Sequence, residues 1–368
     1  MHAQIQTIMN NFFKIIFLCT LGLTVVSCSK SDTTTEPLRD FAEQYTKDLI
    51  SIETYMHTHY MEVTNNPGAT EDQDVTFTLI PAGGTQTSIW DQTTYPILTR
   101  YVKVKQNNVD VTYKIYFIQL RQGSGAYSKS PSNVDRVLTS YRGEYIYSST
   151  VTSGTPPVST TTIISNEFEE SINPQNYFNL TSVIRGWSEI FPQFKTGTYS
   201  GNPDGVYPPN TDGTTSYYDF GAGVMFIPSG LAYFNTSAGG IPGYSPLIFN
   251  FKLYEIQRID QDADGIYSYQ EDLATSTTNS AGIVTVTSGV PDGYLFNMAT
   301  GIVNPDDTDG DEIPDYLDVD DDNDFFTTAS EIKNPITGQA YLFADIPTCG
   351  GSGNGKKKYL DPSCHGQP

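Results

Sequence analysis

Six apolar residues recur at three- and four-residue spacing in the middle of the chain: Val183, Ile184, Trp187, Ile190, Phe191 and Phe194. This spacing predicts a short helix with one buried face, and Gly197 stands where a helix C-cap is expected. Residues 38–61 repeat the helical spacing, which predicts an N-terminal helix with a packing or spacer role. His57 and His59 of that helix have no third metal ligand nearby in the sequence, so we expect surface histidines.

The pattern changes from helical spacing to strands after residue 100. Alternating, β-branched and aromatic runs predict strands at residues 101–105, 111–120 and 134–147. The segments 148–164 and 198–223 are rich in small, polar and turn-forming residues, and we expect expanded loops there. Residues 65–99 indicate only loops and short strands.

The N-terminus has the pattern of a targeting segment. Lys14 precedes an apolar run over residues 15–26, which ends in Val25-Val26-Ser27-Cys28. A basic flank, a short apolar core and small residues before a cysteine resemble a bacterial lipoprotein signal, with Cys28 as the lipidated first residue. The alternative is a short transmembrane anchor, although a bilayer span takes about 20 apolar residues. The resemblance implies attachment to a membrane of the cell envelope, most simply the outer membrane, at its periplasmic face or the cell surface.

The charge is strongly negative and unevenly placed. The net charge is −22, and residues 260–331 hold 18 acidic residues and no Lys or Arg. Nucleic acid is therefore excluded as a partner, because its phosphates require clustered basic side chains. The acidity belongs to one segment and is not a general solubility device.

That acidic segment contains calcium-loop spacing. Residues 260–271 place acids at positions 1, 3, 5 and 12 and glycine at position 6, which is the EF-hand pattern, and residues 320–331 repeat it with Phe325 at position 6. Residues 307–318 resemble the Asp-rich repeats of thrombospondin type 3, with Glu312 at the glycine position. The alternative is a solvated acidic linker. The ligands expected for structural Ca²⁺ are Asp260, Asp262, Asp264, Ile266 (carbonyl), Ser268, Glu271, Asp307, Asp309, Asp311, Asp315, Asp318, Asp320, Asp322, Asp324 and Glu331.

Several short motifs occur in the order found in one known enzyme family. Val183-Ile184-x-Gly186-Trp187 resembles the central helix of FK506-binding-protein (FKBP) peptidyl-prolyl isomerases. Other matching pieces, over about 150 residues, are the Gly123-x-Gly125 turn with Tyr141-x-Gly143, the run Phe168-Glu169-Glu170-Ser171, the strand, proline and Ala-Tyr loop of residues 224–233, and the lid and last strand of residues 240–253. The sequence departs from the family at Glu169, which replaces an aspartate, and at Gly243, which replaces a second proline.

The resemblance implies an α+β fold in which an antiparallel sheet wraps on a short central helix. It also implies a peptidyl-prolyl cis-trans isomerase, acting as a folding factor on proline-containing client polypeptides without a catalytic cofactor. The pocket residues it implies are Tyr141, Phe168, Glu169, Val183, Ile184, Trp187, Tyr233, Ile241 and Phe249. Two alternatives remain, a non-catalytic FKBP-fold binding module and a structural calcium-binding surface lipoprotein.

These patterns divide the chain into five segments. They are a signal peptide (1–28), a tether with an N-terminal helical or irregular segment (29–100), an FKBP-like domain (101–259), an acidic calcium-binding region (260–335) and a C-terminal tail (336–368). Cys349 and Cys364 lie in that tail, where an oxidising envelope favours a disulfide worth roughly 3 kcal/mol. A zinc site with His365 is the less favoured alternative.

Overall fold

The computed structural model describes residues 37–106, 109–203, 205–272, 275–278, 284–288, 306–349 and 355–364. Contacts divide the chain into residues 1–38 and 39–368, and all elements named below belong to the second unit. The expected signal peptide and Cys28 lie outside the described residues. Within the described ranges, no helix combines the length and the apolar character that a membrane crossing requires.

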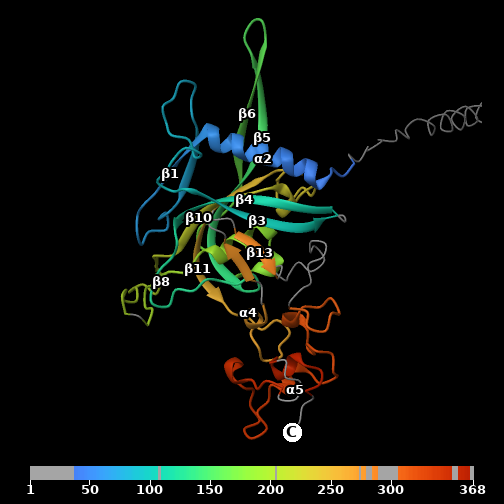
Figure 1. Cartoon of the computed structure of the whole chain (residues 1–368). Helices are drawn as coiled ribbons and strands as arrows, with labels where there is room; N and C mark the ends of the chain where they lie inside the picture. The colour runs from blue at the N-terminus through green and yellow to red at the C-terminus, as the bar shows by residue number, and fades with distance from the viewer. Residues whose placement is uncertain are drawn as a thin grey trace, which may run out of the picture. The chain divides into compact units, whose positions relative to one another are not determined.

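A nine-stranded sheet of the described residues forms the framework of this unit (Figure 1). Its strands run in the order β12-β13-β3-β4-β10-β11-β5-β6, β7 pairs with β5, and every pair is antiparallel except β13 with β3. The bounds are β3 (Ile97–Gln106), β4 (Val109–Arg121), β5 (Arg136–Ser153), β6 (Val158–Ser171), β7 (Phe178–Asn179), β10 (Gly221–Ile227), β11 (Leu247–Gln257), β12 (Thr275–Thr278) and β13 (Val284–Ser288). The predicted mixed architecture of helices and antiparallel sheet is confirmed.

Apolar clusters lie on both faces of this sheet, and the central strand β10 serves both. Val224 and Phe226 join one cluster, whereas Met225 and Ile227 join the other. Successive side chains of a strand point to opposite faces. A strand covered on both sides is therefore apolar throughout, as β10 is.

Helices of different length cover the two faces. The short α3 (Arg185–Ile190) lies between the 3₁₀ turns η1 (Leu180–Ser182) and η2 (Phe191–Gln193) and packs on one cluster. α2 (Phe41–Thr58) buries Ile52, Tyr55 and Met56 in the other cluster, while its first turns reach the α3 side through Phe41 and Tyr45. The N-terminal helix thus contacts both sides of the fold.

The end of α2 differs from the sequence prediction. The helix stops at Thr58, and the chain continues as β1 (His59–Val63), which pairs with β2 (Val75–Leu79). His59 is buried and not a surface histidine, because its ring stacks on Tyr55 with centroids 3.8 Å apart. Burial lowers the pKa of His59. His57 is exposed, as expected.

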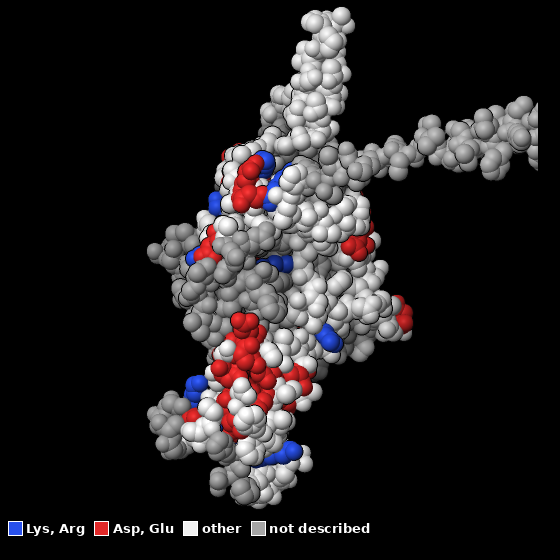
Figure 2. Space-filling model, turned by 90° about the vertical axis from the view of Figure 1, so that its right-hand side faces the viewer, with Lys and Arg blue, Asp and Glu red and all other residues white. Residues whose placement is uncertain are grey.

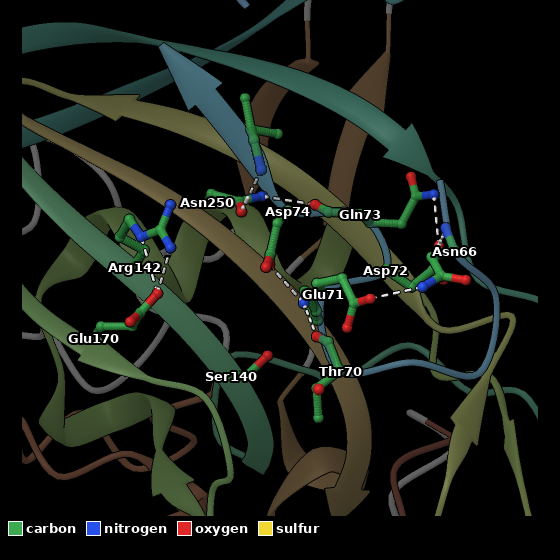
Figure 3. A network of polar contacts seen from close by, with 12 residues as sticks. Asn66, Thr70, Glu71, Asp72, Gln73, Asp74, Ser140, Arg142, Glu170 and Asn250 are labelled. Carbon is green, nitrogen blue, oxygen red and sulfur yellow. Dashed lines mark hydrogen bonds and ion pairs between the residues drawn. The ribbon is translucent and has the colours of Figure 1, made fainter. Parts of the chain in front are cut away.

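Buried polar side chains attach the N-terminal segment to β11 (Figure 3). Asn250 accepts a hydrogen bond from the Val75 backbone N–H at 3.1 Å and donates to the carbonyl oxygens of Gln73 and Gly223 at 3.3 and 3.2 Å. Lys252, also buried, forms an ion pair with Asp74 at 2.6 Å. These contacts join the segment before residue 100 to the sheet, and residues 39–368 form one compact unit.

The two expanded segments contain strands where loops were expected. Residues 148–164 extend the β5–β6 hairpin, whose pairing continues to Ser153 and Val158 with most side chains exposed (Figure 1). Within 198–223, β8 (Thr198–Tyr199) pairs with β9 (Tyr217–Tyr218) before β10 begins. The Ser and Thr residues that suggested a loop instead form exposed cross-strand pairs, such as Thr150 with Thr161 at 2.9 Å.

Gly197 is not the C-cap of the central helix. That helix ends at Ile190, and the 3₁₀ turn after it ends at Gln193. A Cβ at Gly197 would lie 2.0 Å from the Tyr218 carbonyl oxygen and 2.4 Å from the Phe220 nitrogen. The glycine is needed because two backbone segments pass each other there.

The acidic C-terminal part has a small apolar cluster of its own, formed by Ile266, Ile332, Ile346 and Tyr359. Its helical elements are short: α4 (Ser268–Glu271), η5 (Asp315–Leu317), α5 (Thr328–Glu331), η6 (Phe343–Asp345) and η7 (Lys358–Leu360). A disulfide joins Cys349 and Cys364, whose Cα atoms lie 5.6 Å apart.

Replacing Asn250 tests the polar attachment. Asn250→Leu keeps the side chain's volume but removes the acceptor of the Val75 N–H and a donor to two carbonyl oxygens. Leaving the buried N–H unsatisfied alone costs about 1–3 kcal/mol. We expect the free energy of unfolding to fall by about 2–4 kcal/mol in urea denaturation. The control Thr150→Val, which removes an exposed hydroxyl, should change it by less than about 0.5 kcal/mol. An Asn250→Leu protein as stable as the parent would contradict this role.

Candidate functional site

The site begins with the packing of α3 on the sheet. A Cβ at Gly186 would lie 2.6 Å from Ile227 of β10, so only glycine lets the helix approach this closely. The approach brings Trp187 over the sheet, where it is 4% exposed. Its ring contacts those of Tyr141 and Phe249 edge to face, with centroids 5.0 and 5.2 Å apart. Trp187 thus forms the base of an aromatic cluster.

A cavity of about 700 Å³ opens above this cluster. Eight of the nine expected pocket residues line it: Tyr141, Phe168, Glu169, Val183, Ile184, Trp187, Tyr233 and Phe249. The ninth, Ile241, does not line it and lies 2% exposed in the adjacent core. The sequence motifs therefore come together in space, although they span more than a hundred residues of chain.

Two tyrosines and one carboxylate form the polar edge of the cavity. Tyr141 donates a hydrogen bond to Glu169, and burial together with this carboxylate raises the pKa of Tyr141. Burial and the charge of Glu169 also raise the pKa of Tyr233. Both phenols are protonated at neutral pH, so they act as hydrogen-bond donors.

Gly143 makes room for two of the aromatic walls. A Cβ at this position would lie 2.5 Å from the ring of Phe168 and 2.9 Å from that of Phe249. The two rings pack edge to face at 5.7 Å. The Tyr-x-Gly motif of β5 therefore supplies one polar group and the space for two rings.

Sequence reasoning missed several lining residues. Phe178 of β7 packs on Trp187 at 5.5 Å, whereas its neighbour Tyr177 hydrogen-bonds Glu255 at 2.6 Å. The pairing of β7 with β5 decides which of the two faces the cavity, and that pairing has no local signal. The other missed residues are Val104, Gln106, Ser182, Arg185, Gly230, Leu231, Ala232 and Phe234.

A buried ion network holds α3 beside the cavity. Glu189, completely buried, accepts from Arg100 of β3 at 2.7 Å and from Arg185 at 3.3 Å. Removing one partner of such a network leaves an uncompensated buried charge. The network therefore fixes the position of α3 relative to β3.

The N-terminal helix supports the opposite wall. Asp48 of α2 accepts hydrogen bonds from the Ser229 N–H at 2.7 Å and the Ser229 hydroxyl at 2.6 Å. Phe41 stacks on Phe234 with ring centroids 4.0 Å apart. Because residues 229–234 carry Tyr233, α2 positions a residue of the cavity and is more than a spacer.

The pKa of Asp48 is raised to about 6. Burial raises it, and this outweighs the hydrogen bonds from Ser229 and Gln44, which lower it. The folded state therefore binds this proton more tightly than the unfolded state. The resulting stabilisation is fully present below about pH 4 and is lost as pH rises through about 6. It amounts to something on the order of 3 kcal/mol.

A comparison with Asp48→Asn isolates this titration, because the asparagine side chain is uncharged throughout. We expect the stability difference between parent and variant to change between pH 4 and pH 7, with the parent losing more. Urea denaturation of both proteins at several pH values measures it. A difference that is constant over this range would contradict a raised pKa for Asp48.

The three acidic loops share one backbone arrangement. In each, the first-position carboxylate accepts from the sixth-position N–H: Asp260 from Gly265 at 3.1 Å, Asp307 from Glu312 at 3.2 Å and Asp320 from Phe325 at 3.1 Å. Glu312 and Phe325 have φ of 78° and 74°, in the left-handed region that Gly265 also occupies. This conformation costs a non-glycine residue about 1–2 kcal/mol, so the loop geometry is retained despite the missing glycines.

The alternate carboxylates of each loop converge, as the spacing predicts. Their ligand oxygens lie within 4.8 Å of one another in three groups: Asp260 with Asp262 and Asp264, Asp307 with Asp309 and Asp311, and Asp320 with Asp322 and Asp324. On the face that Figure 2 presents, acidic side chains gather over this part of the molecule.

The remaining expected ligands are placed differently. Ser268 accepts from the Gln261 N–H at 3.1 Å, Asp315 from Thr308 at 2.8 and 2.9 Å, and Asp318 from the Asp320 N–H at 2.9 Å. Ile266 is buried in the apolar cluster, with its N–H bonded to Asp264. Glu331 is 1% exposed and Glu271 3% exposed, and the oxygens of both lack hydrogen-bond partners among the described residues. Glu271 groups with Asp264 and with Asp321, which was not among the expected ligands.

Comparisons with known proteins give partial matches. Residues 261–356 match the family model described as BamM C-terminal. A comparison with curated proteins finds no match.

Solved structures of FKBP-type isomerases resemble part of the chain. A peptidyl-prolyl cis-trans isomerase from Pseudomonas syringae pv. tomato shares 23% identity, covering 39% of this chain and 76% of its own, with a TM-score of 0.25. FkpA from Escherichia coli shares 22% identity over 42% of this chain and 51% of its own, with a TM-score of 0.24. The N-terminal domain of FKBP42 from Arabidopsis thaliana shares 12% identity, covering 39% of this chain and 86% of its own, with a TM-score of 0.24. These similarities are too low to carry a functional argument.

Proposed function

We propose that the cavity above Trp187 binds X–Pro segments of client polypeptides and catalyses their cis–trans isomerisation. One observation carries the proposal: eight residues that the FKBP-like motifs assign to a proline pocket line a single cavity. Its volume of about 700 Å³ and its aromatic walls suit an apolar ring with its flanking backbone.

The reaction needs no nucleophile or cofactor. Amide resonance sets the rotational barrier at about 18–20 kcal/mol, and both isomers of an X–Pro bond lie within about 0.5–1 kcal/mol of each other. A site that binds the twisted bond better than either planar isomer lowers the barrier. An apolar cavity does this because resonance places charge on the carbonyl oxygen, and removing water from that oxygen disfavours the planar state.

Each wall of the cavity has a role in this scheme. The rings of Trp187, Phe168 and Phe249 surround the proline and exclude water. The Tyr233 hydroxyl, on a loop held by Asp48, donates a hydrogen bond that orients the substrate backbone. The Tyr141–Glu169 pair supplies a fixed polar edge.

Substituting Tyr233 tests the catalytic proposal. Tyr233→Phe removes one hydroxyl and little volume, so we expect kcat/KM for a proline peptide to fall roughly 3–10-fold with the fold unchanged, as for a neutral hydrogen bond of about 1 kcal/mol. The matched control is Tyr127→Phe, at an exposed tyrosine outside the cavity. The assay uses the soluble chain lacking residues 1–28.

The same assay on the parent protein distinguishes an isomerase from a non-catalytic binding module. Isomerisation of the peptide supports the enzyme. Binding of a proline peptide or an FK506-like macrolide without turnover favours a non-catalytic binding module. If the parent neither isomerises nor binds these ligands, both functions are refuted. Trp187→Leu, which removes the base of the cavity, should weaken any binding that is found.

We also propose that the protein is a lipid-anchored component of the cell envelope. The sequence around Cys28 supports lipid attachment, and the match of residues 261–356 to the BamM C-terminal family supports an outer-membrane-related location. Clients would then be polypeptides that cross or enter the envelope.

Cys28→Ser tests the anchor. Without the thiol no acyl chain can be attached, so we expect the protein to move from the membrane to the soluble fraction on cell fractionation. Ser27→Ala, a small residue for a small residue beside the cysteine, should remain on the membrane. A Cys28→Ser protein that stays on the membrane with its N-terminus uncleaved would support a transmembrane anchor instead.

We propose, third, that the acidic loops hold structural calcium. The converging carboxylates offer only oxygen ligands, as Ca²⁺ prefers. The cavity residues all precede residue 260, so the ions would order the C-terminal part without entering the isomerase reaction.

A further inference from the structure

One group of carboxylates crosses from one acidic loop to another. Asp264 and Glu271 belong to residues 260–271, whereas Asp321 belongs to residues 320–331. Their ligand oxygens lie within 4.8 Å of one another, and all three side chains are buried. Asp321 occupies the second position of its own loop, which the alternating ligand pattern leaves unused.

Among the described residues, five of the six carboxylate oxygens of these side chains lack a hydrogen-bond partner. Asp321 is 1% exposed and Glu271 3% exposed, and among the described residues neither oxygen of either group has a hydrogen-bond partner. The Oδ2 atom of Asp264 is also without one. Buried charges in proteins are paired or bind metals, and the charges that act on Glu271 are all carboxylates.

We propose that Asp321 is a ligand of the cation held by the 260–271 loop, so that a single calcium ion joins the two loops. The inference rests on the calcium proposal above and adds to it a ligand that the loop pattern does not contain.

The distances suit one ion. Calcium–oxygen distances are about 2.3–2.6 Å, so two oxygens on opposite sides of an ion lie at most about 5 Å apart. Asp260 and Asp262 group with Asp264, which belongs to both groups. The carboxylates of both groups, with Glu271 binding through two oxygens, and the Ile266 carbonyl would supply the six to eight oxygens of a calcium shell.

The electrostatics agree with this geometry. Burial and crowding by neighbouring carboxylates both disfavour the charged forms of Glu271 and Asp321. A divalent cation removes both causes, since it neutralises the charges and coordinates the oxygens. The competing explanation is a shared proton between the carboxylates, which needs no metal.

Calorimetric titration of the full-length chain with CaCl₂ tests the proposal. Asp321→Asn and Glu271→Gln should weaken the same binding step, each about 10-fold or more, since loss of even an outer-shell partner costs 10–100-fold. The double variant should lose much less than the product of the two effects, because both residues serve one ion. The matched control is Glu331→Gln, which removes the twelfth-position ligand of the 320–331 loop and should weaken a different step.

The outcomes separate this inference from the calcium proposal. No calcium heat from the parent would refute the calcium proposal, and a shared proton would then explain the cluster. Two results would overturn this inference while leaving the calcium proposal intact. In the first, the parent binds calcium and Asp321→Asn binds it equally well. In the second, Asp321→Asn weakens the same binding step that Glu331→Gln weakens. If Asp321→Asn does not fold in saturating calcium, Asp321→Glu decides by the same comparison, since it keeps the charge and moves the oxygens by one methylene.

Discussion

The close approach of α3 to β10 is the constraint on which the site depends. Gly186 permits it, since any side chain there would overlap Ile227. With the helix at this distance, Trp187 reaches the rings from β5 and β11, and Glu189 reaches Arg100 on β3. The cavity is what remains between this helix, the sheet and the loop that carries Tyr233. Its shape is thus set by backbone packing, and its chemistry by the few polar groups at its edge.

The sequence predicts local features well because they depend on neighbours along the chain. The helical spacing around Trp187, the strands from residue 101 onward and the carboxylate spacing of the loops are all of this kind. Features that depend on distant partners were not predictable. Asp48 bonds Ser229 across 181 residues, and Asn250 bonds Val75 across 175. No pattern in a single sequence marks either pair, and both attach a segment that composition alone describes as a helix followed by loops.

Predictions from residue type were wrong where the same residues are compatible with two structures. Ser and Thr over residues 148–164 indicated a loop, yet β-branched and hydroxyl side chains also form cross-strand pairs, as they do in the β5–β6 hairpin. Gly197 suited a helix cap, but the close passage of Tyr218 requires glycine there for a different reason. His59 was expected at the surface because no third metal ligand lies near it in the sequence, yet its ring stacks on Tyr55 and is buried. In each case contacts that the composition does not reveal decided between two interpretations.

The two parts of the chain are stabilised by different kinds of interaction. The sheet and its helices bury two large apolar clusters, so the cavity rests on hydrophobic burial. The acidic part has an apolar cluster of four buried residues and one disulfide, against many carboxylates that repel one another. Carboxylates held this close repel one another unless cations or protons neutralise them. Under the proposals above, calcium in the envelope would control the acidic part and leave the isomerase cavity unaffected.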